Sequence, residues 1–524
     1  MRKFLLALTL LSTVAASAAP ALQIGTEFTQ FAAGYSSFVY VTNVSEETAK
    51  DVVVRFEHGP DLTIPVDVTP VTQNWQCTRD AHGMTCRLAE FAAAATALFP
   101  FRFDSTDLAG GHRSASVSVT ARDVPTPQTI TFDVIAPREI HVLTDADFGA
   151  GSLRGAIEEV NEHALCGTDV PCVVRFPTAT TDGDAPPLTI KPATPLPAIR
   201  KCNVGILGPG DFQTSFADKG VVISGENATH GNGLEVRTSC VHLPGVTLAN
   251  LAVNSWPWNG LYFEAPKAHF GELSGLHSVE HLYVGTDATG RIARPNGSRG
   301  IVTDSPHELI SIYYTIASGN GRSGIALFRG KSAIIGGALL GVDVDGHPTG
   351  NGGAGLMSID VPVLASRSTI AYNGMGVAVA KGTREMVLIQ NLIHSNQGLA
   401  VDWGLDGRTP RDGETIQPPR ILSAFYNPST DTTYVGGVVY VRPGQFGNRF
   451  LIDPYLSNAR GDAVRYVPQF PDLVLAPAEG GEVAFEVGIP GDRRGKFIVL
   501  QTHAADDREQ RRLSSELSES IKVP

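Results

Sequence analysis

Residues 148–161 read Phe-Gly-Ala-Gly-Ser-Leu-Arg-Gly-Ala-Ile-Glu-Glu-Val-Asn, and this stretch decides the fold of the chain. Ser152 is a residue type that caps helix N-termini, and the residues that follow it at the i, i+3, i+4 and i+7 spacing of one helix face are apolar: Leu153, Ala156, Ile157 and Val160. The region after them consists of short β-type runs punctuated by Gly and Asn. A lone amphipathic helix ahead of such an array predicts the cap of a solenoid.

A Gly followed by an apolar residue recurs along the array. These pairs begin at Gly260, Gly300, Gly324, Gly355, Gly376 and Gly398. The last two intervals are 21 and 22 residues long, which suits one coil of a β-solenoid. We therefore expect these glycines at equivalent corners of successive coils.

Asn and a second repeat reinforce this prediction. Asn precedes or lies near several corners, at Asn259, Asn320, Asn373 and Asn396. Asn tolerates left-handed backbone, and stacked amide side chains can bond from coil to coil. In addition, the stretch 284–290 recurs as 340–346 with an offset of 56 residues, and each copy is followed by an Asn, at Asn296 and Asn351.

The segment at 148–161 resembles the Gly-Ser-Leu-Arg-x-Ala-Ile signature of secreted bacterial right-handed parallel β-helix proteins. The likeness continues through the strand-like runs at 173–176 and 188–190 and through the Ile-x-Gly-Pro-Gly run at 206–210. The resemblance implies an all-β fold. It is a right-handed single-stranded parallel β-helix of the pectin-lyase-like type, with an N-terminal capping α-helix and flanking N- and C-terminal β-sandwiches.

The chain is predicted to contain four segments. Residues 1–18 combine a basic start, a short apolar run and an Ala-Ser-Ala site, which is typical of a secretory signal peptide. Residues 19–136 alternate apolar and polar positions and resemble the Ig-like β-sandwich modules of bacterial surface proteins, in which a Trp packs beside the disulfide. Residues 137–418 form the capped β-helix, and residues 419–524 form a C-terminal β-sandwich. No later segment is a transmembrane candidate.

Charge and cysteine content narrow the function classes. The formal net charge of −12 without a basic stripe disfavours a nucleic-acid partner, and no Gly-rich phosphate loop suggests a nucleotide. Six cysteines in an exported chain are expected to form disulfides. Six cysteines permit 15 connectivities; pairing of sequence neighbours would join Cys77 to Cys86, Cys166 to Cys172 and Cys202 to Cys240.

The candidate site residues are few. Two carboxyl groups or an acid/base set are what a glycosidase or lyase needs, and Asp304, His307 and Glu308 are the candidates for such a set. Aromatic platforms bind sugar rings, and the candidates are Trp256, Trp258, Tyr313 and Tyr314, with core packing as the alternative for the tryptophans. The recurrent acids Asp287, Asp343 and Asp345 either cap turns or bind a cation such as Ca²⁺. Asp402 and Asp406 lie where the helix meets the C-terminal domain, and they either belong to an ordered linker or bind calcium or a sugar.

The favoured function is non-catalytic binding or adhesion by a secreted or cell-surface protein, with a glycan or envelope component as the ligand. The alternatives are a polysaccharide lyase or glycoside hydrolase of the same fold, and an architectural spacer. No cofactor is required by the favoured function. Outward aromatic rings without a convergent acid/base set would indicate a binder, and paired carboxylates in a groove would indicate an enzyme.

Overall fold

The computed structural model describes residues 21–31, 34–59, 62–63, 75–101, 104–105, 109–122, 124, 127–177, 186–210, 216–238, 240, 243–265, 275–306, 308–380, 382–383, 385–407, 417–441, 449–467, 472–475, 480–505 and 511–524. The predicted signal peptide lies outside these residues. The chain divides into two compact units. The first ends at Glu139 and includes Asp169–Cys172, and the second comprises Ile140–Thr168 and Val173–Pro524.

The first unit contains antiparallel sheets. One has the order β1 (Leu22–Phe31), β2 (Gly34–Asn43), β7 (Thr96–Phe101). Another has the order β10 (Gln128–Ala136), β9 (Gly111–Thr120), β3 (Ala49–His58), β6 (Gly83–Phe91), β5 (Gln76–Asp80), and a short pair joins β4 (Leu62–Thr63) to β8 (Asp104–Ser105).

The core of this unit is aromatic. Trp75 packs edge-on against Phe91 and Phe99, with ring centroids 5.9 Å and 5.0 Å away. The disulfide Cys77–Cys86 crosslinks β5 and β6 close by, so this predicted pair is confirmed.

The predicted cap helix is confirmed as α1 (Leu153–Glu162). The Ser152 hydroxyl oxygen accepts a hydrogen bond from the Gly155 amide at 3.1 Å, and the predicted apolar face is buried. Arg154 is buried as well, although no apolar pattern marks it. Its guanidinium donates to the Asp147 carboxylate at 2.7 Å and to the Thr194 carbonyl at 3.0 Å, which ties the helix to the following segment.

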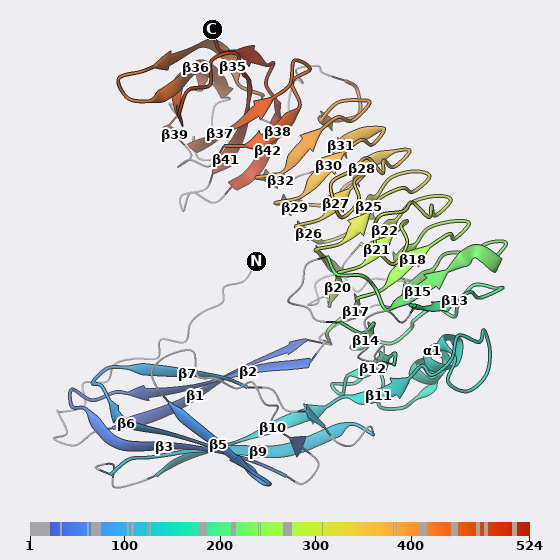
Figure 1. Cartoon of the computed structure of the whole chain (residues 1–524), viewed down its shortest axis with the longest axis vertical. Coiled ribbons are helices and arrows are strands. Elements are labelled where there is room, and N and C mark those ends of the chain that lie inside the picture. Colours follow the sequence, from blue (N-terminus) through green and yellow to red (C-terminus); the bar gives the residue numbers. More distant parts are fainter. Residues whose placement is uncertain are drawn as a thin grey trace. The chain divides into compact units, whose positions relative to one another are not determined.

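The second unit is dominated by three parallel sheets, which follow one another in each coil from β14 (Val204–Leu207) onward (Figure 1). Sheet I contains β11 (Arg138–His141), β12 (Cys172–Arg175), β14 (Val204–Leu207), β17 (Val246–Ala249), β20 (Leu276–Glu280), β23 (Leu309–Tyr313), β26 (Ser332–Gly336), β29 (Val363–Ser366) and β32 (Met386–Ile389). Sheet II begins with β13 (Leu188–Ile190), β15 (Val221–Ser224), β18 (Ala252–Asn254), β21 (Tyr283–Val284), β24 (Ile316–Ala317), β27 (Leu339–Leu340), β30 (Thr369–Ala371) and β33 (Leu392–His394). Sheet III contains β16 (Leu234–Arg237), β19 (Leu261–Glu264), β22 (Ile301–Asp304), β25 (Ile325–Arg329), β28 (Ala354–Ser358), β31 (Met375–Val379) and β34 (Val401–Trp403). This topology makes the second unit a single-stranded parallel β-helix, as predicted.

The Gly-apolar pairs mark the start of sheet III. The apolar partners stack in register through seven coils: Leu234, Leu261, Ile301, Ile325, Leu356, Val377 and Val401. The preceding glycines are needed for close approach, because a β-carbon on Gly300 would lie 2.6 Å from the Gly324 carbonyl oxygen. The prediction for Gly398 is wrong. Val401 occupies the equivalent position, so the last coil is offset and Ala400 takes the place of the glycine.

A ladder of buried amides runs along the inside of the sheet II to sheet III corner. Each side-chain amide donates to the amide oxygen of the next coil at 2.8–3.1 Å, in the order Asn296, Asn320, Asn351, Asn373 and Asn396. The predicted coil-to-coil bonding is thus confirmed. Asn259 bonds instead to Asn232 at 2.9 Å, outside this ladder.

The opposite corner, between sheets I and II, turns through a single left-handed residue. This corner row consists of Asn250, His281, Tyr314, Gly337, Arg367 and Gln390, with φ between 47° and 60°. Each directly follows a sheet I strand, so their side chains succeed one another along the solenoid at about 4.8 Å per coil.

The last coil continues into the C-terminal region. Sheet II extends from β33 through β38 (Ala463–Tyr466), β37 (Arg449–Ser457), β41 (Phe497–Ala505) and β42 (Arg511–Leu517), with β39 (Asp472–Leu475) and β43 (Ile521–Lys522) beside it. A separate antiparallel sheet contains β35 (Arg420–Asn427), β36 (Thr432–Val441) and β40 (Gly481–Pro490). The predicted domain boundary at residue 419 stays a prediction. Sheet II contains β-helix strands that precede this residue and C-terminal strands that follow it.

A buried polar network joins this region to the last coils. The Leu388 amide donates to the Ser514 hydroxyl at 2.8 Å, and that hydroxyl lies 2.7 Å from Nδ1 of His503. Nε2 of His503 lies 3.1 Å from the Asp453 carboxylate. All three side chains are fully buried, so this Ser-His-Asp arrangement is a structural contact rather than an accessible triad. No helix in the described residues is long and apolar enough to cross a membrane.

Candidate functional site

Two tyrosine rings stand on the outside of the solenoid. Tyr313 is the last residue of β23 and Tyr314 is its corner-row neighbour. Their side chains are 36% and 44% exposed, and their ring centroids lie 6.5 Å apart. Both were predicted as candidate ligand-binding residues, and the structure leaves both rings exposed next to each other.

The coils on either side hold these rings in place. The His281 ring stacks on the Tyr314 ring, with centroids 5.3 Å apart and planes 26° apart. On the other side the rings lie over Gly336 and Gly337, where added β-carbons would approach the Tyr313 and Tyr314 rings to 2.6 Å and 2.8 Å. Any larger residue at these two positions would displace the rings.

Polar groups border the rings on sheet I. The Ser278 hydroxyl donates to the Glu280 carboxylate at 2.5 Å and lies 3.0 Å from the Ser311 hydroxyl. Glu280 is the register partner of Tyr313. Burial, the Glu280 carboxylate and Tyr314 raise the pKa of Tyr313, so its phenol stays protonated and can donate a hydrogen bond at neutral pH.

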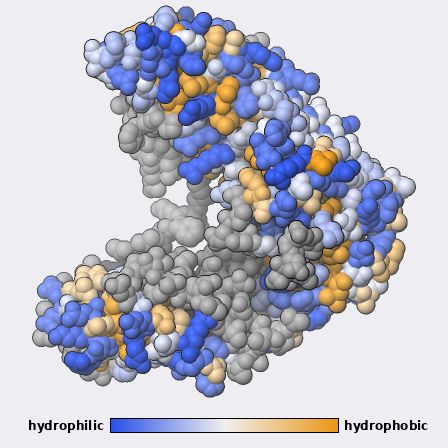
Figure 2. Space-filling view, in the orientation of Figure 1, coloured by the Kyte–Doolittle hydropathy of each residue, from blue (hydrophilic) through white to orange (hydrophobic). Residues whose placement is uncertain are grey.

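We call Tyr313 and Tyr314, with Ser278, Glu280 and Ser311, the tyrosine platform. Flat aromatic faces next to hydroxyl and carboxylate groups match a ligand with an apolar ring face and hydroxyls at its edges. In the view of Figure 2 the described residues are mostly hydrophilic, with small groups of apolar residues between them.

The two tryptophans do not share a face. Trp258 is 52% exposed and contacts the His230 ring edge-on at 6.3 Å. Trp256 is only 1% exposed, and its indole N–H donates to the Ile223 carbonyl at 3.2 Å inside the solenoid. The packing alternative therefore holds for Trp256. The two residues lie outside any strand, so they do not form a joint platform.

The predicted acid/base set is divided between the outside and the inside of the coil. Asp304 is the last residue of β22, is partly exposed and forms an ion pair with Arg329. Glu308 is buried at 6% exposure. His307 lies outside the described residues. Asp304 and Glu308 thus face different surroundings, which gives no support to a shared catalytic role.

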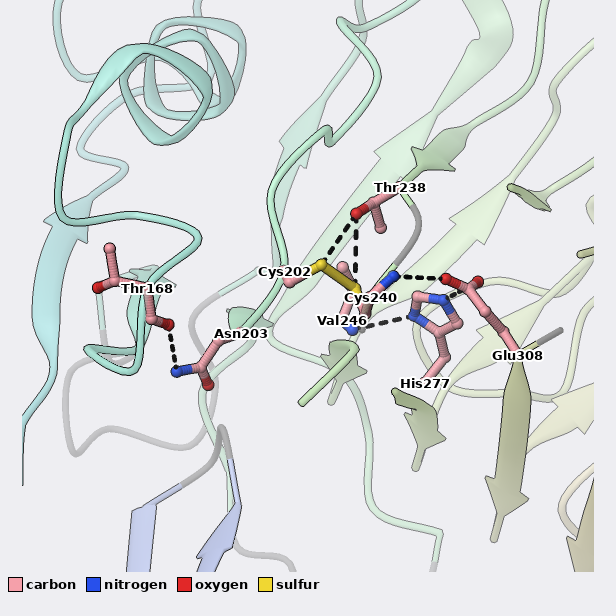
Figure 3. The surroundings of a disulfide bond; sticks show 8 residues. All are labelled: Thr168, Cys202, Asn203, Thr238, Cys240, Val246, His277 and Glu308. Carbon is pink, nitrogen blue, oxygen red and sulfur yellow. Dashed lines mark hydrogen bonds and ion pairs between the residues drawn. A yellow bond between two sulfur atoms is a disulfide. The ribbon is translucent and has the colours of Figure 1, made fainter. Parts of the chain in front are cut away.

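Glu308 belongs to a buried network beside a disulfide (Figure 3). The Val246 amide donates to Nδ1 of His277 at 2.9 Å, so the ring proton is on Nε2, which lies 2.5 Å from the Glu308 carboxylate. The Cys240 amide donates to the other carboxylate oxygen at 3.0 Å. Sequence reasoning missed His277, although its register with the core residue Ile310 shows that it points inward.

The same figure shows the disulfide Cys202–Cys240, which confirms a second predicted pair. The Thr238 hydroxyl lies 3.1 Å from the Cys202 sulfur. Cys166 and Cys172 are disulfide-bonded as well, so all six cysteines are oxidised.

Sheet III carries two carboxylates near Asp304, those of Glu235 and Glu264, that the sequence analysis did not single out. Arg237 contacts Glu235 at 3.0 Å and Glu264 at 3.3 Å, and Glu264 is the register partner of Asp304. Both central carboxylates are therefore ion-paired, Glu264 with Arg237 and Asp304 with Arg329.

The acids predicted to bind a metal are mostly used by turns. Asp343, Asp345 and His347 place ligand atoms within 4.8 Å of one another. However, Asp343 Oδ1 accepts from the Asp345 and His347 amides at 2.9 Å and 2.8 Å, and Asp345 pairs with Arg291 at 2.8 Å. Asp287 likewise accepts from the Arg291 amide at 3.2 Å. These contacts match the turn-forming alternative.

The two remaining acids lie at the end of sheet III. Asp402 on β34 is 4% exposed, and Asp406 follows in an exposed turn. One carboxylate oxygen of Asp402 has no hydrogen-bond partner within the described part of the chain. The structure does not group either residue with the other candidate metal ligands.

Comparison with known proteins gives no family assignment. No family model matches the chain, and no curated protein matches it in sequence. Similar solved structures include the Azotobacter vinelandii mannuronan C-5 epimerase AlgE6 A-module, which is 14% identical over 50% of this chain and 78% of that chain, with a TM-score of 0.25. The enzymatically active domain of bacteriophage CBA120 tailspike protein 2 is 9% identical over 69% and 62% of the two chains, with a TM-score of 0.18. The catalytic domain of a GH87 α-1,3-glucanase is 9% identical over 72% and 86%, with a TM-score of 0.14. Since these scores are low, the class of the protein, an all-β parallel β-helix of the pectin-lyase-like type, rests on its own sheet topology.

Proposed function

We propose that this chain is an exported protein that binds a glycan without transforming it, and that the tyrosine platform is its binding site. The observation that carries the proposal is the placement of the Tyr314 ring, exposed on one side and held between His281 and Gly337. An exposed ring that is fixed before binding loses little conformational freedom when a ligand stacks on it. Such rings stack on the C–H faces of sugars, and the half-buried Glu280 carboxylate beside Tyr313 can accept hydrogen bonds from sugar hydroxyls.

The solenoid offers room for an extended ligand. Arg367, exposed in the corner row, follows Tyr314 by two coils, or about 10 Å. A polymer lying along the row would meet the aromatic rings first and then the guanidinium donors. We therefore expect affinity to rise with chain length until the row is covered.

The platform lacks what hydrolysis requires. A glycosidase needs two carboxyl groups on either side of the scissile bond. Among the described platform residues Glu280 is the single carboxylate, and it is hydrogen-bonded by Ser278. The Glu264–Asp304 pair lies on sheet III and is ion-paired, so it supports the enzyme alternative only weakly.

Export is supported by the cysteines. All six are disulfide-bonded, which is typical of proteins that fold in an oxidising compartment. The predicted signal peptide and the likeness of residues 19–136 to bacterial Ig-like modules agree with a secreted or surface location.

Binding to a polysaccharide panel tests the proposal, with product formation followed in parallel. We expect saturable binding to at least one glycan, a loss of at least tenfold in affinity for Tyr313→Ala and Tyr314→Ala, and no reducing ends or unsaturated uronides. Tyr440→Ala is the matched control, because Tyr440 is 50% exposed on the C-terminal region. Product formation that disappears in Asp304→Asn would establish the enzyme alternative. Absence of both binding and products would favour a spacer.

A further inference from the structure

A cavity of about 250 Å³ lies where the last coil of the solenoid meets the C-terminal region. The coil contributes the segment Gln397–Val401, and the C-terminal region contributes Arg460–Asp462, Glu516 and Leu517. Both walls belong to the second compact unit. None of the site residues predicted from the sequence lines this cavity.

Polar contacts between the walls keep the cavity in shape. A terminal guanidinium nitrogen of Arg460 donates to the Asn396 and Gln397 carbonyls at 3.2 Å and 3.4 Å. One Asp462 carboxylate oxygen accepts from the Ser395 amide at 3.2 Å and from Asn458 at 2.8 Å.

Glu516 anchors the third side, since its carboxylate accepts from the Trp403 amide at 3.0 Å. The charged groups are thus fixed by the protein itself. A ligand does not have to order them, which lowers the entropic cost of binding.

Hydrogen-bonding capacity remains at the walls. Within the described structure, Nε and one terminal nitrogen of Arg460 carry no hydrogen bond, and the same holds for one carboxylate oxygen of Asp462. Donors beside acceptors suit a hydroxyl group, which both donates and accepts. Leu399 and Leu517 add apolar surface for a ring face.

The charge balance selects against anions. Arg460 and Asp462 carry opposite charges and line the same cavity, so a phosphate or a uronate would find no net positive charge to bind. A neutral ring with several hydroxyls does not need one.

A strip with little side-chain cover leads to the cavity. Along the sheet II to sheet III corner, successive coils place Gly297, Gly321, Gly352 and Gly374 at equivalent positions ahead of Gln397, joined by backbone hydrogen bonds to the coil before. Trp258 lies at the far end of this corner, since its carbonyl accepts from the Ser298 amide of the next coil. The strip explains how a chain could reach the cavity, whereas the cavity itself supplies the recognition groups.

We propose that this cavity is a second ligand site, which takes one neutral sugar residue. It lies at a different corner from the tyrosine platform, so it does not depend on that site. Arg460 and Asp462 bind the hydroxyls, and Leu399 and Leu517 contact the ring face.

The test is saturation-transfer NMR of the full chain with glucose, galactose, mannose and N-acetylglucosamine, with glucuronate as the anionic comparator. Leu399→Trp fills the cavity from a partly exposed position, and Arg460→Lys keeps the charge but removes the fork of donors. We expect one neutral sugar to bind and both variants to weaken it at least tenfold, while the double variant Tyr313→Ala/Tyr314→Ala binds as the wild type does.

Three results would overturn the proposal: no saturable binding of any neutral sugar, stronger binding of glucuronate, or unchanged binding in Leu399→Trp with an unchanged melting temperature. Failure of the tyrosine platform would show differently. In that case Tyr313→Ala/Tyr314→Ala would bind the polysaccharide as tightly as the wild type does, whether or not a monosaccharide binds in the cavity.

Discussion

The ring of Tyr314 rests on Gly337 of the next coil, where a β-carbon would lie 2.8 Å from ring atom Cδ1. Both residues belong to the corner row, and both adopt left-handed backbone, with φ of 47° and 60°. The glycine therefore serves two purposes, since it relieves the left-handed turn and makes room for the ring.

We predict that Gly337→Ala weakens glycan binding about as much as Tyr314→Ala does, because the methyl group displaces the ring. The left-handed backbone adds a cost of about 1 kcal/mol in folding stability. The measurement is a binding isotherm together with a thermal melt.

Gly346→Ala is the matched control for that variant. Gly346 also has positive φ, at 84°, but no atom lies within 4 Å of the added β-carbon. It should show a similar loss of stability and unchanged binding. If Gly337→Ala binds as tightly as Gly346→Ala does, the ring placement is irrelevant to function.

The amide ladder should contribute to the stability of the solenoid beyond its apolar core. The Asn351 side chain makes four hydrogen bonds, to the Asn320 amide and side chain, to the Ala317 carbonyl and to Asn373. Asn351→Ala leaves these buried groups unpaired, so we expect a loss of at least about 3 kcal/mol in urea unfolding. Asn259→Ala, which is outside the ladder and less buried, should cost about 1 kcal/mol. Equal losses of unfolding free energy in the two variants would show that the ladder contributes no more than an asparagine outside it.

The disulfide Cys202–Cys240 closes a loop with a sequence separation of 38, against 9 for Cys77–Cys86. In the chain-entropy account, the longer loop should contribute about 4 kcal/mol and the shorter about 3 kcal/mol. We therefore expect Cys202→Ala/Cys240→Ala to lower the unfolding transition of the second unit, and Cys77→Ala/Cys86→Ala to lower that of the first. Proteolysis of each unit across a urea series separates the two effects; a shift of both units by either variant would be inconsistent with this assignment.

Lys219 gives the chain a pH dependence on the alkaline side. The side chain is 4% exposed, its ammonium lies 4.3 Å from the centroid of the Tyr283 ring, and burial lowers its pKa to about 8, against 10.5 ordinarily. Between these values the unfolded chain binds a proton that the folded chain does not. Folding stability should therefore rise from pH 8 to about 10.5, by roughly 3 kcal/mol.

Lys219→Met removes the titrating group and supplies the comparison. The variant should be more stable than the wild type at pH 7, and the difference should vanish as the pH approaches 10.5. Chemical unfolding at a series of pH values measures this difference. A constant difference across the range would show that Lys219 keeps its ordinary pKa in the folded state.

Much of the fold was predictable because it rests on short-range rules. Ser152 and the apolar face of α1 follow helix periodicity, and the glycines at 260, 300, 324, 355 and 376 each precede an apolar residue that stacks on the next coil in sheet III. Gly398 misled because the last coil is offset by two residues, where it meets the C-terminal region. The spacing of residues in the sequence cannot reveal a contact between the last coil and the C-terminal region.

The site was predictable only in part. Tyr313 and Tyr314 could be named, but their placement depends on Gly336 and Gly337, which are more than twenty positions away in sequence and adjacent only after the coils stack. A shared face for Trp256 and Trp258 would require a strand, whereas the structure has no strand at these residues and only Trp256 packs inside the solenoid. The cavity residues Arg460 and Glu516 come from separate segments, so no local motif marks them.

The most direct measurement is an affinity isotherm for the best glycan of the panel, with wild type, Tyr314→Ala and Tyr440→Ala compared under one condition. The account predicts that Tyr314→Ala loses at least tenfold in affinity, which is about 1.4 kcal/mol, while Tyr440→Ala matches the wild type. Equal affinities for all three proteins would contradict the assignment of the tyrosine platform as the binding site.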